Sequence, residues 1–190
     1  MTCIDGIFDS CPNIQAQNYV DSHYYYPVVT GGSFSTKSIT AGRTYYLGPF
    51  VAKENTVITR LGLNVTTGSG VGGDTAIMGI YSYKDSLPYQ LRGTNDAEVP
   101  IDAIAEVEAT VSIPLVQGQL YFIAVNFENT CTVAAFANSN NVRDSGIADD
   151  SSTTLIKETI AYASTFPATS AAVVGDYTSE SLPHLWFRKV

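Results

Sequence analysis

Residues 105–113 read Ala-Glu-Val-Glu-Ala-Thr-Val-Ser-Ile, and apolar and polar side chains alternate along the whole stretch. Successive side chains of a β-strand point to opposite faces, so this period of two predicts a strand with one buried and one solvated face. Pro114 ends the run. A strand of this kind needs a second layer to cover its apolar face, which points to an all-β protein.

A second strand is predicted at residues 120–127, which read Leu-Tyr-Phe-Ile-Ala-Val-Asn-Phe. This run is too apolar to be exposed on either face. Gln117-Gly118 supplies turn chemistry between the two stretches. We therefore expect residues 105–113 and 120–127 to pair with each other.

Other strand patterns are separated by glycine and proline, and they occupy residues 56–66, 76–83, 132–137 and 184–188. Neither a strand-helix-strand alternation nor a repeat of about 20 to 50 residues accompanies them. The fold class that we predict is all-β: an antiparallel two-sheet β-sandwich, jelly-roll-like, with an extended N-terminal arm.

The arm is assigned to residues 1–33 and the sandwich domain to residues 34–190. Residues 1–33 lack a sustained period but contain the cluster Tyr24, Tyr25 and Tyr26. Such rings must be buried either on the chain's own sandwich or on a neighbouring subunit. The three tyrosines are therefore the candidate anchor of the arm.

Residues 151–163 leave two alternatives open. Leu155, Ile156, Thr159, Ile160 and Ala163 recur at helical spacing. The threonine content and the surrounding serine and glycine favour an extended loop instead.

Composition and charge exclude several classes of partner. The chain has 190 residues, enough for one domain, and its net charge is −8. It contains 17 Ser, 20 Thr and 10 Asn but only ten Lys and Arg, so it cannot form the clustered basic surface that nucleic acid or an anionic membrane requires. No apolar run reaches the roughly 20 residues of a membrane span, and the N-terminus lacks signal-peptide features, so we expect a cytosolic product.

No cofactor or metal is expected. The three cysteines and two histidines have no zinc-binding spacing. Cys3 and Cys11 are close enough in sequence to close a small disulfide loop, or they are simply unpaired. Cys131 lies beside an apolar strand and is expected to be a small buried residue.

An enzyme is not expected either, because no Gly-x-Ser-x-Gly elbow is present and only two histidines are available as a base. The one candidate acid pair is Glu106 and Glu108, roughly 6 to 7 Å apart on one face of a strand. Solvated carboxylates are ordinary at such positions, so a β-sandwich glycoside hydrolase is the weakest alternative.

Tyrosines gather around the loop at residues 84–88. Tyrosine combines a flat apolar ring with a polar edge, which suits glycan or receptor contact. The candidate contact residues are Tyr81, Tyr83, Asp85 and Tyr89. Alternatively, Tyr81 and Tyr83 simply pack at a sheet edge, which leaves Tyr89 as the more exposed residue.

Five strings taken together resemble a known family. They are Tyr-Tyr-Leu-Gly-Pro-Phe at 45–50, Thr-Val-Ile-Thr-Arg-Leu-Gly-Leu-Asn-Val at 56–65, Ala-Ile-Met-Gly-Ile-Tyr at 76–81, Gly-Gln-Leu-Tyr-Phe-Ile-Ala-Val at 118–125 and Leu-Pro-His-Leu-Trp-Phe-Arg at 182–188. In order and strand character they resemble β-sandwich domains of tailed-bacteriophage virion proteins, found in head-decoration proteins and in tail-fibre or receptor-binding modules. The resemblance covers about residues 40–190.

The resemblance implies a non-enzymatic structural protein, capsid- or tail-attached, that assembles into a virion in the host cytoplasm. Proteins of this kind are commonly homotrimers, so the implied partners are further copies of the chain and other virion proteins. Its alternative role, as a receptor-binding module of a tail fibre, implies a host surface glycan as partner.

Overall fold

The structure is a computed structural model, and it describes residues 19–26, 34–95, 97–137, 155–163, 165–178 and 180–190. Among these residues there is one short 3-10 turn, η2 (Val174–Asp176), and no α-helix. The strands are β1 (Phe34–Ser38), β2 (Arg43–Val51), β3 (Thr56–Thr67), β4 (Thr75–Lys84), β5 (Leu87–Thr94), β6 (Val99–Pro100), β7 (Ala105–Leu115), β8 (Leu120–Phe127), β9 (Thr132–Phe136), β10 (Leu155–Thr159), β11 (Tyr177–Thr178), β12 (Leu182–Pro183) and β13 (Trp186–Arg188). Cys3 and Cys11 lie outside the described residues, whereas Cys131 is buried as predicted.

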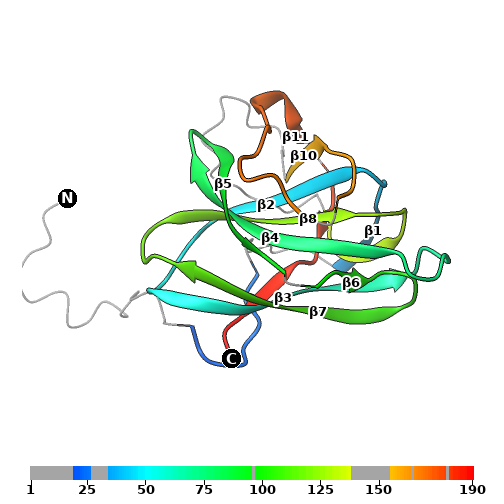
Figure 1. The fold of residues 1–190 in the computed structure, drawn as a ribbon, viewed down its shortest axis with the longest axis horizontal. Helices are drawn as coiled ribbons and strands as arrows, with labels where there is room; N and C mark the ends of the chain where they lie inside the picture. The colour runs from blue at the N-terminus through cyan, green and yellow to red at the C-terminus, as the bar shows by residue number, and fades with distance from the viewer. Residues whose placement is uncertain (1–18, 27–33, 96, 138–154, 164, 179) are drawn as a thin grey trace, which may run out of the picture.

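The strands form two antiparallel sheets packed face to face, which confirms the predicted β-sandwich (Figure 1). The six-stranded sheet contains β1, β9, β3 and β7, and the seven-stranded sheet contains β2, β8, β4 and β5. Along the chain these eight strands pair from the outside inward: β1 with β9, β2 with β8, β3 with β7, and β4 with β5. A chain folded double in this way and wrapped into two sheets is a jelly roll.

The expected pairing of residues 105–113 with 120–127 is wrong. β7 pairs with β3 in the six-stranded sheet, whereas β8 lies between β2 and β4 in the other sheet. Residues 116–119 therefore cross from one sheet to the other. The reason is that β8 is buried on both faces and needs a central position, whereas β7 exposes one face.

Apolar cores lie on both faces of the seven-stranded sheet. The main core fills the space between the sheets and includes Met78 and Phe127. A second core lies on the outer face of the seven-stranded sheet, where Tyr81 and Phe122 are covered by Phe166. The two cores explain why residues 76–83 and 120–127 are apolar on both faces.

The helical alternative for residues 155–163 is wrong. Residues 155–159 form β10, which pairs with β2, and the residues after it have no regular secondary structure. Leu155 belongs to the main core and Ile156 to the second core. Neighbouring residues that point to opposite sides require a strand rather than a helix.

The buried carboxylate of Glu158 holds in place the segment that covers the second core. This segment is residues 165–172, and we call it the covering segment. Glu158, on β10, accepts hydrogen bonds from the Tyr46 hydroxyl at 2.7 Å, the Ser170 hydroxyl at 3.2 Å and the Ala171 backbone N–H at 3.2 Å. Burial, with the Glu158 charge adding to it, raises the pKa of the Tyr46 hydroxyl far above its usual value, so that hydroxyl stays a donor. The carboxylate thus joins β2, β10 and the covering segment.

Part of the N-terminal arm is built into the sandwich. Tyr25 pairs with Phe187 of β13 through two backbone hydrogen bonds of 2.9 Å. The buried Tyr19 ring packs edge-on against both Tyr25 and Phe187, with ring centroids 4.7 and 5.5 Å away. Residues 19–26 therefore lie on the chain's own sandwich, which is the first of the two alternatives for the arm tyrosines.

An ion-pair cluster joins the two sheets at the edge formed by β1 and β10. The Glu180 carboxylate binds both Lys37 of β1 and Lys157 of β10. Partial burial of Glu180 opposes its ionisation, but the hydrogen bonds and charges of Lys157 and Lys37 outweigh burial and lower its pKa to about 2. Glu180 is therefore an acid-sensitive link between the sheets.

We expect this link to be lost in acid. Because the folded pKa of Glu180 is lowered, its contribution to stability is complete above the usual value of 4.5 and disappears as the pH falls toward about 2. Solvent screening limits that contribution to about 1 kcal/mol. Urea unfolding at pH 7 and pH 3 should show a smaller acid-induced loss in Glu180→Gln than in the unsubstituted protein. An equal loss in both proteins would contradict this prediction.

Candidate functional site

Ring side chains meet on the outer side of the six-stranded sheet and form what we call the aromatic cluster. Its members are Tyr24, Tyr26, Phe34, Phe136, His184 and Trp186. They come from the arm, β1, β9 and the last segment of the chain. Leu185 and Phe187 point into the main core, so Trp186 between them points away from the other sheet.

Trp186 lies beneath Tyr24 in the aromatic cluster. Its side chain is only 2% exposed and lies over Gly62, where an added Cβ would come within 2.0 Å of the indole ring. Gly62 therefore provides the space that the indole occupies. Tyr24 covers the indole from outside, edge-on, with ring centroids 4.6 Å apart.

Three rings of the cluster are presented to solvent. Tyr24 is 46% exposed, Tyr26 38% and Phe34 76%. Tyr26 stacks on His184 with centroids 4.4 Å apart and ring planes 9° apart, and Phe34 packs on Phe136. Burial lowers the pKa of His184 from its usual 6.5, although the Glu106 charge opposes this, so the imidazole is neutral at pH 7 and stacks as an uncharged ring.

A polar border runs beside the cluster on β3, β7 and β13. Asn64 and Glu106 lie opposite each other on β3 and β7. The Glu106 charge acts on both Tyr26 and His184; burial is the main cause of the raised pKa of Tyr26, and Glu106 adds to it. The Arg188 guanidinium lies 5.4 Å from the centre of the Tyr24 ring. Carboxylate, amide and guanidinium groups therefore flank the exposed rings.

The two predicted acids have different surroundings. Glu108 binds the Nε of Arg60 at 2.9 Å and the Nη2 of Arg188 at 2.6 Å, so both carboxylate oxygens are engaged. A glycosidase acid must instead present a proton to the substrate. Among the described residues, Glu106 has neither a hydrogen bond nor an ion pair. Glu108 therefore belongs to an ion-pair cluster, whereas Glu106 is an exposed acid.

In comparisons with known proteins, no family model and no curated sequence matches this chain. Within the described ranges, no group of three His, Cys, Asp or Glu side chains is placed to hold a metal ion. Nor does any helix in that part of the chain have the length and hydropathy needed to cross a membrane.

The tyrosines predicted around residues 84–88 are divided by the fold. Tyr81 is buried in the second core and donates a hydrogen bond to the Pro167 carbonyl at 2.7 Å, so its ring is not available to a surface ligand. Tyr83 is half-buried and stacks on Phe122. Only Asp85 and Tyr89 are exposed, at the tip and on one strand of the β4–β5 hairpin.

The hairpin tip is a tight turn with unusual residues. Lys84 pairs with Leu87, and the two residues between them, Asp85 and Ser86, have φ of 50° and 68°. Two positive φ values define the type I′ turn, which favours Asn-Gly. The Tyr177 hydroxyl also binds the Ser86 carbonyl, which ties the tip to β11.

We expect Ser86→Gly to stabilise the protein. A left-handed conformation costs a residue other than glycine about 1 to 2 kcal/mol, and the greater freedom of glycine in the unfolded chain offsets part of that gain. The net increase should be about 0.5 to 1 kcal/mol, or roughly 2 °C in Tm. The matched control is Ser112→Gly in β7, which should lower Tm because glycine weakens a strand. A lower Tm for Ser86→Gly would contradict this prediction and would mean that loss of the hydrogen bond between the Ser86 and Tyr83 hydroxyls outweighs relief of the positive φ.

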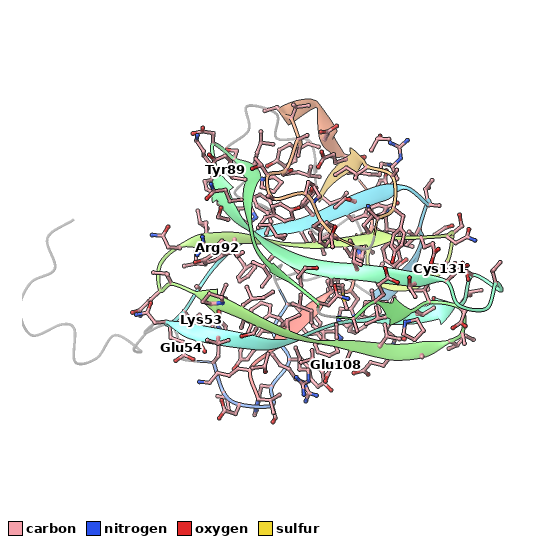
Figure 2. The ribbon with its side chains drawn as sticks, in the orientation of Figure 1. Lys53, Glu54, Tyr89, Arg92, Glu108 and Cys131 are labelled. Carbon is pink, nitrogen blue, oxygen red and sulfur yellow. The ribbon has the colours of Figure 1, made fainter. Side chains whose placement is uncertain are left out.

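One end of the sandwich carries exposed valines, and we call it the arm end. Hydrogen bonds join Lys53 to Tyr19 and Ala52 to Gln119, and ion pairs join Lys189 to both Asp21 and Glu54. Its exposed apolar residues are Val20, Val51, Val57, Val116 and Val190. Figure 2 shows Lys53 and Glu54 at this end, far from Tyr89 on the β4–β5 hairpin.

The sequence identified the arm tyrosines but not their partners in the aromatic cluster. Apolar side chains alternate in the strand pattern at residues 184–188, and the structure places Leu185 and Phe187 on the opposite face from Trp186. A tryptophan on the strand face that points away from the core is the sequence feature that could have indicated an aromatic surface there. Phe34 and Phe136 gave no such signal, because only strand pairing brings them together.

Proposed function

We propose that this chain is a non-enzymatic structural subunit of a virion, of the tailed-phage β-sandwich kind, attached to its particle through the N-terminal arm. The observation that supports this is the docking of residues 19–26 on the sandwich. Because Tyr19 is buried, the described part of the arm begins at a fixed point on the domain. A tether with a fixed origin orients the domain that it anchors.

The exposed residues of the arm end also support attachment on the side of the domain from which the N-terminal arm starts. Five exposed valines lie at the end of the sandwich where Tyr19 meets Lys53. Apolar side chains gathered on one end of a domain favour a protein contact there. In this proposal the arm end faces the particle, and the hairpin tip at residues 85–86 remains available.

Self-association, with a trimer as the expected assembly, is part of the proposal. A solution mass from light scattering, taken on the full chain, tests it directly. A trimeric mass supports a symmetric virion subunit, whereas a monomeric mass at assembly concentrations contradicts the trimer and leaves arm attachment to be judged by the next experiment.

The test of attachment is deletion of residues 1–18, since deletion of residues 1–33 would also remove Tyr19 and Tyr25 from the packed structure. Tagged copies are expressed in cells that produce the particle, and incorporation is scored by co-sedimentation with purified particles. We expect incorporation to fall at least tenfold while Tm stays unchanged. Tyr89→Ala, which alters an exposed side chain away from the arm end, is the control and should be incorporated normally. Normal incorporation of the truncated chain would overturn the proposal.

A further inference from the structure

We propose that the aromatic cluster and its polar border form a binding site for a neutral saccharide chain. The inference goes beyond particle attachment and holds whether or not the chain is a virion subunit. It rests on three features of one surface: solvent-exposed rings, a rigid base beneath them, and hydrogen-bonding side chains beside them.

The exposed rings are the first feature. Phe34, Tyr24 and Tyr26 keep large apolar areas in water although the sandwich has two well-filled cores. Aromatic side chains gathered on a surface outside the core are typical of a binding surface. The apolar C–H face of a pyranose ring packs on such side chains, and a row of them suits a chain of sugars.

The second feature is that the rings are held in place before any ligand arrives. Tyr26 is stacked on His184, Phe34 rests on Phe136, and Tyr24 stands on the buried Trp186. Rings already fixed by packing lose little conformational freedom on binding, which improves affinity. The neutral His184 allows the Tyr26 stack to persist at pH 7.

The polar border is the third feature and distinguishes a saccharide from an apolar partner. Glu106 is exposed beside Tyr26 and His184 and has free acceptor oxygens, and Asn64 lies opposite it with both donor and acceptor atoms. Two neighbouring hydroxyl groups of a sugar can form hydrogen bonds side by side with a planar carboxylate or amide group. A wholly apolar protein contact would leave Glu106 buried without a partner, which is costly.

Charge narrows the ligand to neutral sugars. The chain carries a net charge of −8, and the exposed acid at the border is Glu106. Glu108 already engages both Arg60 and Arg188, so those guanidinium groups are partly neutralised. Uronic acids and sulfated glycans would therefore be repelled.

Affinity electrophoresis of the full chain tests the site. The gels contain neutral polymers (dextran, mannan and galactan) or anionic ones (heparin and polygalacturonate). We expect at least one neutral polymer to retard the protein and the anionic polymers to have no effect. Phe34→Ala and Tyr26→Ala should weaken the association constant at least tenfold, and Glu106→Gln several-fold.

The matched control is Tyr89→Ala, because Tyr89 is also an exposed tyrosine but lies on the β4–β5 hairpin, away from Glu108 in Figure 2. It should bind as the unsubstituted protein does, and all variants should keep their Tm and solution mass. The proposal is overturned if no neutral polymer retards the protein, if heparin binds best, or if Tyr89→Ala abolishes binding while Phe34→Ala does not. A lower oligomer mass in Phe34→Ala would also overturn it, because the cluster would then be a contact between copies of this chain.

Discussion

Phe187→Ala is expected to lower the free energy of unfolding by about 4 kcal/mol, the usual range for removing a buried phenylalanine ring being about 3 to 5 kcal/mol. Phe187 is buried and packs against Tyr19, Tyr25 and Phe50. Its loss leaves a cavity where the arm meets the sandwich, so residues 19–26 should also become protease-sensitive. The backbone pairing of residue 187 with Tyr25 does not depend on the side chain.

Urea unfolding measures this effect, and Phe34→Ala is its matched control. Both changes remove a phenyl ring, but Phe34 is 76% exposed, so its removal should cost less than about 0.5 kcal/mol. If the two substitutions cost the same, the ring of Phe187 is not packed as described. If only stability falls and residues 19–26 stay resistant to chymotrypsin, which cleaves after their tyrosines, the arm is held by contacts other than Phe187.

Glu158→Ala should lower the free energy of unfolding by about 3 kcal/mol. The substitution removes a charged acceptor and leaves the buried hydroxyl of Tyr46 and the donors of residues 170–171 without their partner. The covering segment should loosen first, because the carboxylate is what joins it to β10 and β2. Hydrogen exchange of residues 165–172 should therefore accelerate more than that of β3.

A double-mutant cycle with Tyr46→Phe isolates this network. Tyr46→Phe alone should cost about 1 kcal/mol, and it should cost less in the Glu158→Ala background because the bond is already gone. Glu158→Gln, which retains a hydrogen-bonding side chain, should be milder than Glu158→Ala. Additive effects of Tyr46→Phe and Glu158→Ala would show that the two side chains do not interact.

The sequence predicted which side chains of the strands are buried better than which strands are neighbours. Alternation in residues 105–113 identified the inward face of β7, because burial of that face is a local property of the strand. The partner of β7 is β3, some 50 residues earlier, and alternation contains no information about it. Proximity along the chain favoured β8 and gave the wrong pairing.

The second core shows a similar limit of prediction from sequence. The run at 120–127 correctly indicated burial on both faces. What covers its outer face is an irregular segment around Phe166, and a segment without period cannot be matched to a sheet from its residue types alone. For the same reason Tyr81, under this cover, could not be separated from the exposed Tyr89 by sequence.

The pairing of Tyr25 with Phe187 also sets an order of events during synthesis. The two residues are 187 − 25 = 162 positions apart, so the ribosome makes nearly the whole sandwich before the arm has a strand to join. Sequence-distant contacts form late because closing long loops is entropically costly. The arm therefore stays undocked on every unfinished chain, and it takes its place only once residues 186–188 exist.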